Sequence, residues 1–203
     1  MKRTARRRVS LPSVSNSPQR TSRLIHNSLF AIHSSHRVGI GNDLHRLAPG
    51  RKLILGGVRI PFDKGPVGHS DGDVLAHAIC DALLGAAALG DIGRHFPDAS
   101  PKWRNASSLL FLRHTRRLLE KAGYAIVNVD ATIGLERPKL APYIPRMRKK
   151  LAAALGIKPE QVSVKAKTGE GLDAVGQGEA LRADAVAIIS VEIRRSTSRP
   201  RDS

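Results

Sequence analysis

Apolar residues occupy every second position across residues 125–133, which is the pattern of a β-strand with one buried face. The apolar side of this strand consists of Val127, Val129, Ala131 and Ile133. Further strands are predicted at residues 38–44, 161–167 and 183–193. Residues 52–60 are typical of a hairpin with Gly56-Gly57 at its turn. The chain is therefore expected to contain a sheet.

Three other segments carry the apolar spacing of helices. The first spans residues 72–89, with Asp71 as a candidate N-cap and Gly90 directly after its end. The second follows residues 103–108 and ends at Gly123, and the third spans residues 142–155. This order of strands and helices predicts an α/β fold, a single-domain sandwich of one mixed β-sheet with helices packed on it. Aromatic residues are only 3% of the chain, so Leu, Ile, Val and Ala must supply the core.

The positive charge lies mainly at the two ends of the chain. Residues 1–37 contain eight Lys and Arg and no acidic residue, and residues 194–203 contain four Arg and one Asp, within a net charge of +17. The composition of residues 1–37 fits a transit peptide, a disordered basic arm, or an upstream region that an over-long gene prediction includes. We expect a basic extension at 1–37, one folded domain at 38–193 and a basic tail at 194–203.

The charge distribution argues against a nucleic-acid-binding protein, although the total charge suggests one. Most of the excess charge lies outside the expected fold, and few aromatic side chains are present for base stacking. No apolar run is long enough to cross a membrane, and the single Cys80 excludes an internal disulfide bond. We expect a cytoplasmic protein, or a plastid protein if residues 1–37 are a transit peptide.

Asp43, His45 and His77 are the strongest candidates for metal ligands. Asp43 and His45 are two residues apart, so a strand places their side chains on one face, and His77 lies in the first predicted helix. Two imidazoles and one carboxylate suit zinc and leave a fourth position open. Asp73 and Asp81 lie four residues before and after His77, and either could bond its other ring nitrogen. The alternative is an exposed helix face whose charges are satisfied without a metal.

A longer series of motifs occurs in one order along residues 38–193. The motifs are Asp43-x-His45, His69-Ser70-Asp71-Gly72-Asp73, His77, Asp81-Ala82-Leu83-Leu84-Gly85-Ala86, Gly90-Asp91-Ile92-Gly93, Phe96-Pro97-Asp98, Asn128-Val129-Asp130, Arg137-Pro138-Lys139 and Val164-Lys165-Ala166-Lys167-Thr168-x-Glu170. Together they resemble the 2-C-methyl-D-erythritol 2,4-cyclodiphosphate synthase family of the non-mevalonate isoprenoid pathway.

The resemblance implies a phosphorus–oxygen lyase. Its members convert 4-diphosphocytidyl-2-C-methyl-D-erythritol 2-phosphate to 2-C-methyl-D-erythritol 2,4-cyclodiphosphate and CMP, by attack of the 2-phosphate on the β-phosphate of the same molecule. The substrate carries its own nucleophile, which agrees with the lack of an evident Ser-His or Cys-His pair in the sequence. Both reacting groups are anionic, so cations are needed to reduce their repulsion.

The resemblance also implies roles for individual residues. One zinc ion per chain would be bound by Asp43, His45 and His77. A second ion, Mg²⁺ or Mn²⁺ on the substrate diphosphate, would be bound by Glu170. His69 and Thr168 would contact the transition state. The implied substrate contacts are Ser70, Asp91, Ile92, Gly93, Phe96, Pro97, Asp98, Ala99, Ser100, Leu135, Glu136, Arg137, Pro138, Lys139, Leu140, Ala141, Lys167 and Gly169. Of these, residues 135–141 match a cytidine pocket, and residues 96–100 match a flexible substrate loop.

A homotrimer with active sites between subunits is also implied, with a small-molecule substrate and neither a membrane nor a specific nucleic acid as partner. The chain has Ala174 and Gln177 where the family often has an aromatic residue and an arginine. Those positions face a central cavity of the trimer that can bind an isoprenoid diphosphate, so this ancillary binding stays open. A related binding module that has lost turnover is the remaining alternative, and the intact metal-binding residues argue against it.

Overall fold

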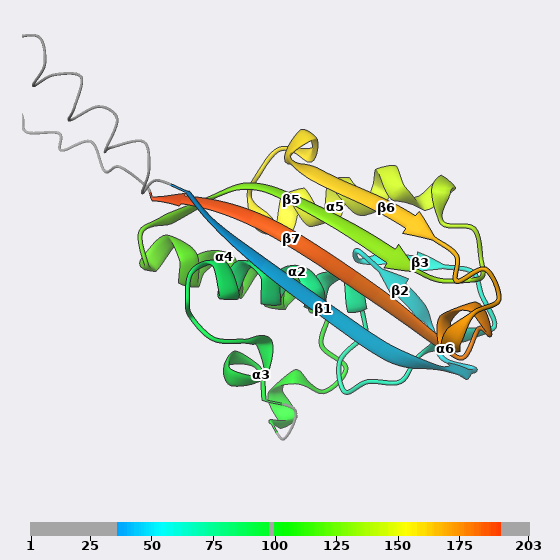
Figure 1. Cartoon of the computed structure of the whole chain (residues 1–203). Helices are drawn as coiled ribbons and strands as arrows, with labels where there is room; N and C mark the ends of the chain where they lie inside the picture. The colour runs from blue at the N-terminus through cyan, green and yellow to red at the C-terminus, as the bar shows by residue number, and fades with distance from the viewer. Residues whose placement is uncertain (1–35, 98–99, 192–203) are drawn as a thin grey trace, which may run out of the picture. The chain divides into compact units, whose positions relative to one another are not determined.

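The computed structural model describes residues 36–97 and 100–191 (Figure 1). The strands are β1 (His36–Pro49), β2 (Leu53–Leu55), β3 (Val58–Ile60), β4 (Lys64–Pro66), β5 (Tyr124–Gly134), β6 (Val162–Lys167) and β7 (Ala180–Val191). The α-helices are α2 (Val74–Ala86), α3 (Ile92–His95), α4 (Ser108–Lys121), α5 (Ile144–Leu155) and α6 (Asp173–Gly176). Single 3-10 turns are η1 (Pro101–Trp103), η2 (Ala141–Tyr143) and η3 (Pro159–Gln161). The expected extension up to residue 35 and the tail at 194–203 lie outside the described residues.

Five strands form one sheet in the order β4-β1-β7-β5-β6. The pair β5 and β6 is parallel and the other neighbouring pairs are antiparallel, which confirms the expected mixed sheet. The expectation of a single sheet is wrong for the hairpin, because β2 and β3 pair only with each other in the described residues. Their apolar side chains are buried in the common core, where β2 contacts α2 and β4 and β3 contacts α5.

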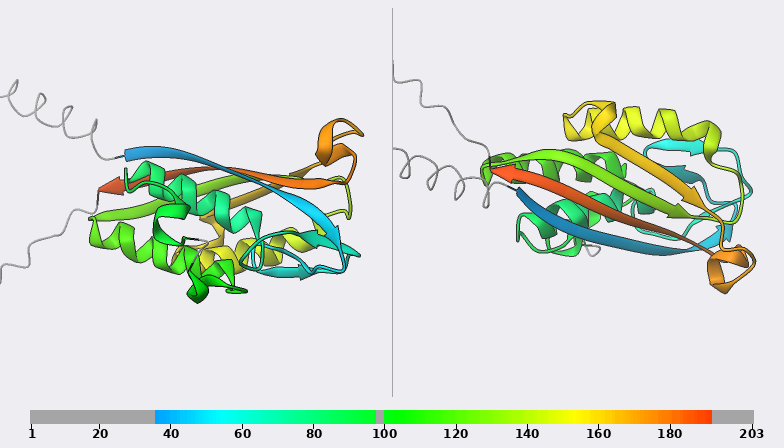
Figure 2. Two further views of the ribbon diagram at one scale, coloured as in Figure 1. Left: turned by 90° about the horizontal axis from the view of Figure 1, so that it is seen from below. Right: turned by 45° about the horizontal axis from the view of Figure 1, so that its top comes forward.

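The helices α2, α4 and α5 cover one face of the main sheet (Figure 2, left). Along β7, the side chains that face them are small or aliphatic and buried: Leu181, Ala183, Ala185, Ala187 and Ile189. The core is built mainly of Leu, Ile, Val and Ala, as expected, with Phe96, Phe111 and Met147 added. Because alanines line the centre of this face, the helices can lie close to the strands.

The opposite face of the sheet carries exposed apolar side chains. Val38, Ile40 and Leu44 of β1 are 68%, 74% and 62% exposed. Ile40 is paired with Val186 of β7, which is 42% exposed, so the apolar area continues across the two strands. Large apolar side chains gathered on one face of a sheet mark a surface for association.

Several boundaries differ from the predicted ones. The helix α2 begins at Val74 with Asp73, not Asp71, as its N-cap, and it ends at Ala86, three residues earlier than predicted. Residues 62–70, 91–98 and 168–178, where no helix or strand was predicted, contain the short elements β4, α3 and α6. The predicted end of α5 at Leu155 is confirmed, and the next residue, Gly156, has a φ of +69° and closes the helix in the left-handed conformation. Within the described residues, no helix is long and apolar enough to cross a membrane.

Candidate active site

Asp43, His45 and His77 converge where β1 passes over α2. The carboxylate oxygens of Asp43 lie 2.9 Å from Nδ1 of His77 and 3.2 Å from Nδ1 of His45. Each of the three residues offers one ligand atom, and these atoms lie within 4.8 Å of one another. The expected shared face of Asp43 and His45 is confirmed. A partly buried set of two imidazoles and one carboxylate fits a zinc ion and leaves room for a further ligand.

Two glycines in β1 allow this convergence. A Cβ atom at Gly39 would lie 2.1 Å from the carbonyl oxygen of Ala82, and a Cβ atom at Gly41 would lie 2.2 Å from that of Ala78. No side chain fits at either position, so β1 rests directly on the backbone of α2. This close approach brings Asp43, at the next inward position of the strand, within reach of His77.

The electrostatics of the triad favour a bound cation. Burial alone would raise the pKa of Asp43, but hydrogen bonds and charge from His45 and His77 outweigh it and lower the pKa to about 2. Asp43 is thus a carboxylate at neutral pH. In the same pocket, burial raises the pKa of Asp81. The hydrogen bond from the N–H of Ile92 lowers this pKa, whereas repulsion from Asp91 and Asp43 raises it further.

The expectation that Asp73 or Asp81 bonds the second ring nitrogen of His77 is wrong. The carboxylate of Asp73 is fully buried and accepts the backbone N–H groups of Gly56, Gly57 and Ala76. Burial raises the pKa of Asp73, although the hydrogen bonds from these three N–H groups lower it. The N-cap position turns this side chain toward the hairpin β2–β3, away from the His77 ring.

Asp81 has its own backbone partner. One of its oxygens accepts the N–H of Ile92 at 2.7 Å and so holds the start of α3. Spacing by four residues therefore places Asp73, His77 and Asp81 on neighbouring turns. The carboxylates of Asp73 and Asp81 nevertheless accept hydrogen bonds from backbone N–H groups and not from His77.

Hydroxyl groups instead lie at the second nitrogen of His77. Nε2 is 2.9 Å from Oγ of Ser108 and 3.2 Å from Oγ of Ser70. Ser108 is fully buried at the first turn of α4, and its hydroxyl donates to Asp71 at 2.5 Å. Sequence reasoning missed Ser108, because a Ser-Ser pair before a helix signals only a cap.

A cavity of about 360 Å³ opens beside the triad. It contains several of the expected substrate contacts, and its lining residues are Asp43, His45, Val67, Gly68, His69, Ser70, His77, Asp81, Ile92, Gly93, Phe96, Trp103 and Phe111. Asp91 lies just outside this lining, where its carboxylate accepts the N–H of Arg94 as the cap of α3. Pro97 is exposed, Ser100 precedes η1, and Asp98 and Ala99 lie outside the described residues.

An aromatic wall of the cavity was not anticipated from the sequence. Phe96 stacks on Phe111 with ring centroids 4.5 Å apart, and Trp103 packs edge-on against both rings. Phe111 also stacks on the ring of His77 at 5.9 Å. The only tryptophan of the chain lies in a polar segment before a helix, and this unusual position could have indicated that Trp103 lines the site.

The remaining expected site residues gather at a second place, the end of β5 and β6. These strands are parallel and Gly134 pairs with Lys167, so residues 135–141 and 168–172 leave the sheet at the same end. The N–H of Leu135 donates to the carbonyl of Lys167, and the N–H of Gly169 donates to the carboxylate of Glu136. The hydroxyl of Thr168 donates to Glu170.

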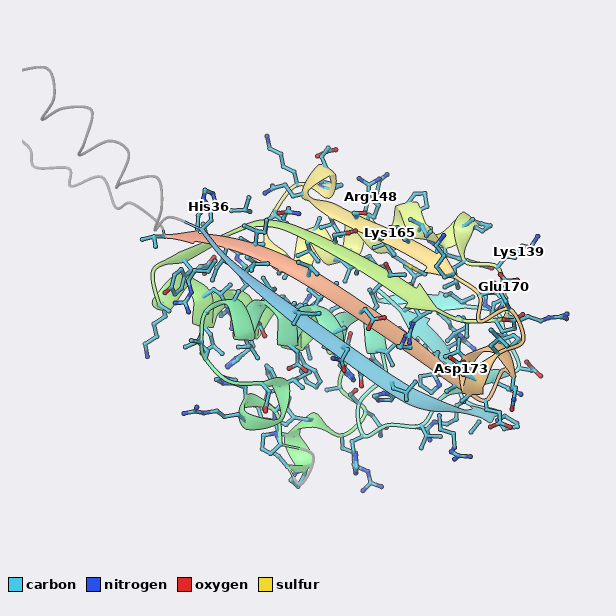
Figure 3. All side chains as sticks on the ribbon, viewed as in Figure 1. His36, Lys139, Arg148, Lys165, Glu170 and Asp173 are labelled. Carbon is cyan, nitrogen blue, oxygen red and sulfur yellow. The ribbon has the colours of Figure 1, made fainter. Side chains whose placement is uncertain are left out.

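This second group presents polar side chains to solvent. Arg137, Lys139, Thr168 and Glu170 are exposed, and Figure 3 shows Lys139 and Glu170 at the same end of the sheet. Leu135 and Leu140 are buried and anchor the segment, while Pro138 is half-buried and Ala141 is exposed. Ala174 and Gln177 are exposed on α6 and at its C-cap.

The chain does not bring the two groups together. In the sheet, β7 and β5 separate β1 from β6. Three strand spacings amount to about 14 Å, so Glu170 and the Asp43–His45–His77 triad belong to different regions of one chain.

The fold and the triad define an α/β protein with a metal-capable pocket, and comparisons with known proteins identify its family. The model of the YgbB family matches residues 36–190, and the chain belongs to this family. It is 57% identical over 153 residues to the 2-C-methyl-D-erythritol 2,4-cyclodiphosphate synthase of Moorella thermoacetica, covering 75% of this chain and 94% of the relative. It is 58% identical to the enzyme of the same name from Chlorobaculum tepidum, covering 75% and 98%.

Solved structures give the same result. A 2C-methyl-D-erythritol-2,4-cyclodiphosphate synthase in a CDP-bound form matches with a TM-score of 0.70 and 40% identity, over 75% of this chain and 99% of that one. The Plasmodium falciparum IspF–CDP complex matches with a TM-score of 0.70 and 34% identity, over 79% and 99%. The bifunctional IspDF of Campylobacter jejuni matches with a TM-score of 0.74 and 35% identity. This match covers 77% of the present chain but only 42% of the Campylobacter jejuni protein.

Proposed function

We propose that this protein converts 4-diphosphocytidyl-2-C-methyl-D-erythritol 2-phosphate to 2-C-methyl-D-erythritol 2,4-cyclodiphosphate and CMP. The observation that carries the proposal is the Asp43–His45–His77 triad in one pocket with His69 and Ser70, within a chain whose relatives bear this enzyme's name at 57–58% identity. The activity is that of a phosphorus–oxygen lyase.

The pocket residues suit an attack of one phosphate on another. When bound by the triad, a zinc ion would polarise a phosphoryl oxygen and reduce the repulsion between the two anions. His69 and Ser70 lie on the pocket wall beside the triad, where they can donate hydrogen bonds to phosphate oxygens. Ile92 and Gly93, with Asp91 before them, flank the pocket where the methylerythritol part would lie. Phe96, Trp103 and Phe111 shield this side from water.

The second group would bind the nucleotide end of the substrate. Residues 135–141 and Lys167 would hold the cytidine, and Lys139 offers a positive charge for phosphate. Glu170 is an exposed carboxylate in the same loop cluster, and it suits Mg²⁺ or Mn²⁺, which prefer oxygen ligands. Thr168, hydrogen-bonded to Glu170, would contact the reacting phosphate.

Both groups must contact one substrate, and their separation in the sheet supports a site shared between two copies of the chain. The exposed apolar face formed by Val38, Ile40, Leu44 and Val186 offers the surface for that association. We therefore propose a homotrimer, in which the triad of one copy faces the Glu170 loop of the next.

A metal analysis combined with an assay of CMP release tests the proposal. The wild-type chain should contain about one zinc ion per chain and release CMP in the presence of Mg²⁺. His77→Ala should lose most of both, while His36→Ala, at the far end of β1 (Figure 3), should keep both. A His77→Ala protein with normal zinc content and turnover would contradict the assignment.

A further inference from the structure

A partly buried chain of hydrogen bonds leads from Asp71 through Ser108 to His77. Asp71 Oδ1 accepts the hydroxyl of Ser108 at 2.5 Å, and both oxygens of Asp71 accept the backbone N–H of Ser108 at 3.1 Å. Oγ of Ser108 lies 2.9 Å from Nε2 of His77. Neither Asp71 nor Ser108 is among the expected ligands or substrate contacts, and Ser108 has no exposed surface.

The direction of these hydrogen bonds follows from the number of protons. Ser108 has one hydroxyl proton, and the carboxylate of Asp71 is both its closer and its stronger acceptor. With that proton committed, Oγ of Ser108 can offer only a lone pair to His77. Nε2 of His77 must therefore be the donor in this contact, which fixes the N–H on Nε2.

Nδ1 of His77 is thereby directed toward the metal position. Because Nε2 carries the N–H, Nδ1 can present its lone pair on the side where Oδ2 of Asp43 lies 2.9 Å away. Two acceptors at this distance repel each other unless a proton or a metal ion lies between them, so a bound metal ion would replace the Nδ1 proton that hydrogen-bonds to Asp43 in its absence. The relay thus orients the ring and prepares Nδ1 and Asp43 to share one cation.

Ser70 does not duplicate this role. Its hydroxyl is 3.2 Å from Nε2 and accepts the N–H of Gly72, but within the described residues no carboxylate partner is recorded for its proton. Its hydroxyl can rotate toward the cavity that it lines, whereas that of Ser108 cannot.

We propose that Asp71 and Ser108 are positioning residues for the metal centre, which hold His77 with Nε2 as donor and Nδ1 as metal ligand. The inference rests on the proposed zinc site and adds to it the residues that orient one of its ligands. Groups that bond the far nitrogen of a metal-binding histidine typically change metal affinity by about ten- to a hundredfold when they are removed.

The test compares Ser108→Ala and Asp71→Asn with Ser107→Ala in the full chain. Ser107 is the exposed neighbour of Ser108, and its side chain caps no N–H group in the described part of the chain. Zinc affinity is measured by competition with a chromophoric chelator, and the melting temperature of each metal-free protein serves as a folding control. The ring of His77 is observed by ¹⁵N NMR of the zinc-loaded proteins.

We expect Ser108→Ala to weaken zinc binding by about tenfold or more and Asp71→Asn to act in the same direction, with Ser107→Ala unchanged. The Nε2 proton of His77 should exchange slowly with water in the wild type and much faster in Ser108→Ala. Ser108→Ala keeps the backbone N–H that Asp71 accepts, so a purely structural role at the start of α4 would leave both readouts unchanged and overturn the inference. If the wild type bound no zinc, or His77→Ala bound it normally, the proposed metal site itself would fall.

Discussion

The Cα atom of Gly41 faces the carbonyl oxygen of Ala78 so closely that a Cβ atom on Gly41 would lie 2.2 Å from that oxygen. This contact joins the strand that carries Asp43 to the helix that carries His77. The nearest atoms on the helix side are two backbone atoms and the Cβ of Asp81, and none of them is the far end of a flexible side chain that could move away. The distance between Asp43 and His77 therefore depends on a residue that is not one of the triad.

Gly41→Ala should force β1 and α2 apart. We expect a loss of about 1–3 kcal/mol in the free energy of unfolding and weaker zinc binding, because Asp43 and His77 separate. Urea denaturation and chelator competition measure the two effects. Gly85→Ala on the same helix is the control. Its Cβ would meet the nearest neighbour at 3.9 Å, so it should be neutral or slightly stabilising. Equal behaviour of the two variants would contradict this account of β1.

Glu170→Gln should separate the two proposed metal sites. The substitution keeps the shape of the side chain and removes its charge, so zinc at the distant triad should stay bound. Turnover should fall by on the order of a hundredfold or more, because the second ion is no longer held on the diphosphate. Zinc content and the rate at increasing Mg²⁺ concentration are measured, with Glu160→Gln, an exposed carboxylate on η3, as control. Loss of zinc, or a normal dependence on Mg²⁺, would show that the sites are not distinct.

The parts of the site that could be predicted from sequence depend on local geometry. The two-residue spacing of Asp43 and His45 places both side chains on one face of β1, and the apolar pattern after residue 72 places His77 on a helix. Asp73 was misjudged because spacing by four says which residues are neighbours, not where a carboxylate at an N-cap points. Its bonds to Gly56 and Gly57 depend on a hairpin 16 to 17 residues earlier in the chain.

The contacts that could not be predicted depend on how distant elements pack. Ser108 and His77 are 31 residues apart, and their contact requires the position of α4 beside α2. The meeting of Glu136 with Gly169 follows from the parallel register of β5 and β6, which no local pattern determines. The strand β4 is three residues long and contains Gly65 and Pro66, so it carries no strand signal of its own.

Cys80 should be almost unreactive in the folded protein. Burial raises the pKa of its thiol to about 12, and the charges of Asp81 and Asp73 add to the shift. The thiolate is the reactive form, so its fraction at pH 8 should be about a thousandfold below that of an ordinary cysteine. Titration with an aromatic disulfide reagent should show one thiol per chain in denaturant and almost none without it. Because the chain has a single cysteine, a fast reaction of the native protein would mean that Cys80 is exposed to solvent, which would contradict the prediction.

Ile40→Glu should disrupt the association of the chains. Ile40 is 74% exposed in one chain and lies in the apolar area of β1 and β7 that we propose as the contact surface. A buried, unpaired carboxylate at such a contact is strongly unfavourable. The molar mass by analytical ultracentrifugation should fall from that of a trimer toward that of one chain, with loss of turnover. Leu110→Glu, at a 45% exposed position on α4, should leave the mass unchanged. A trimer that tolerates Ile40→Glu would place the contact elsewhere.

Two inactive variants should restore activity when they are combined. His77→Ala removes the triad but keeps Glu170, and Glu170→Gln removes the second group but keeps the triad. If the site lies between copies, trimers assembled from a mixture contain some interfaces where both groups are intact. Equal amounts that are unfolded and refolded together should recover roughly a quarter of the wild-type rate of CMP release, since each intact site needs one particular chain on either side. Each variant refolded alone should stay inactive. If both groups of a site came from the same chain, no mixture could contain an intact site, and the absence of recovery would contradict the shared site.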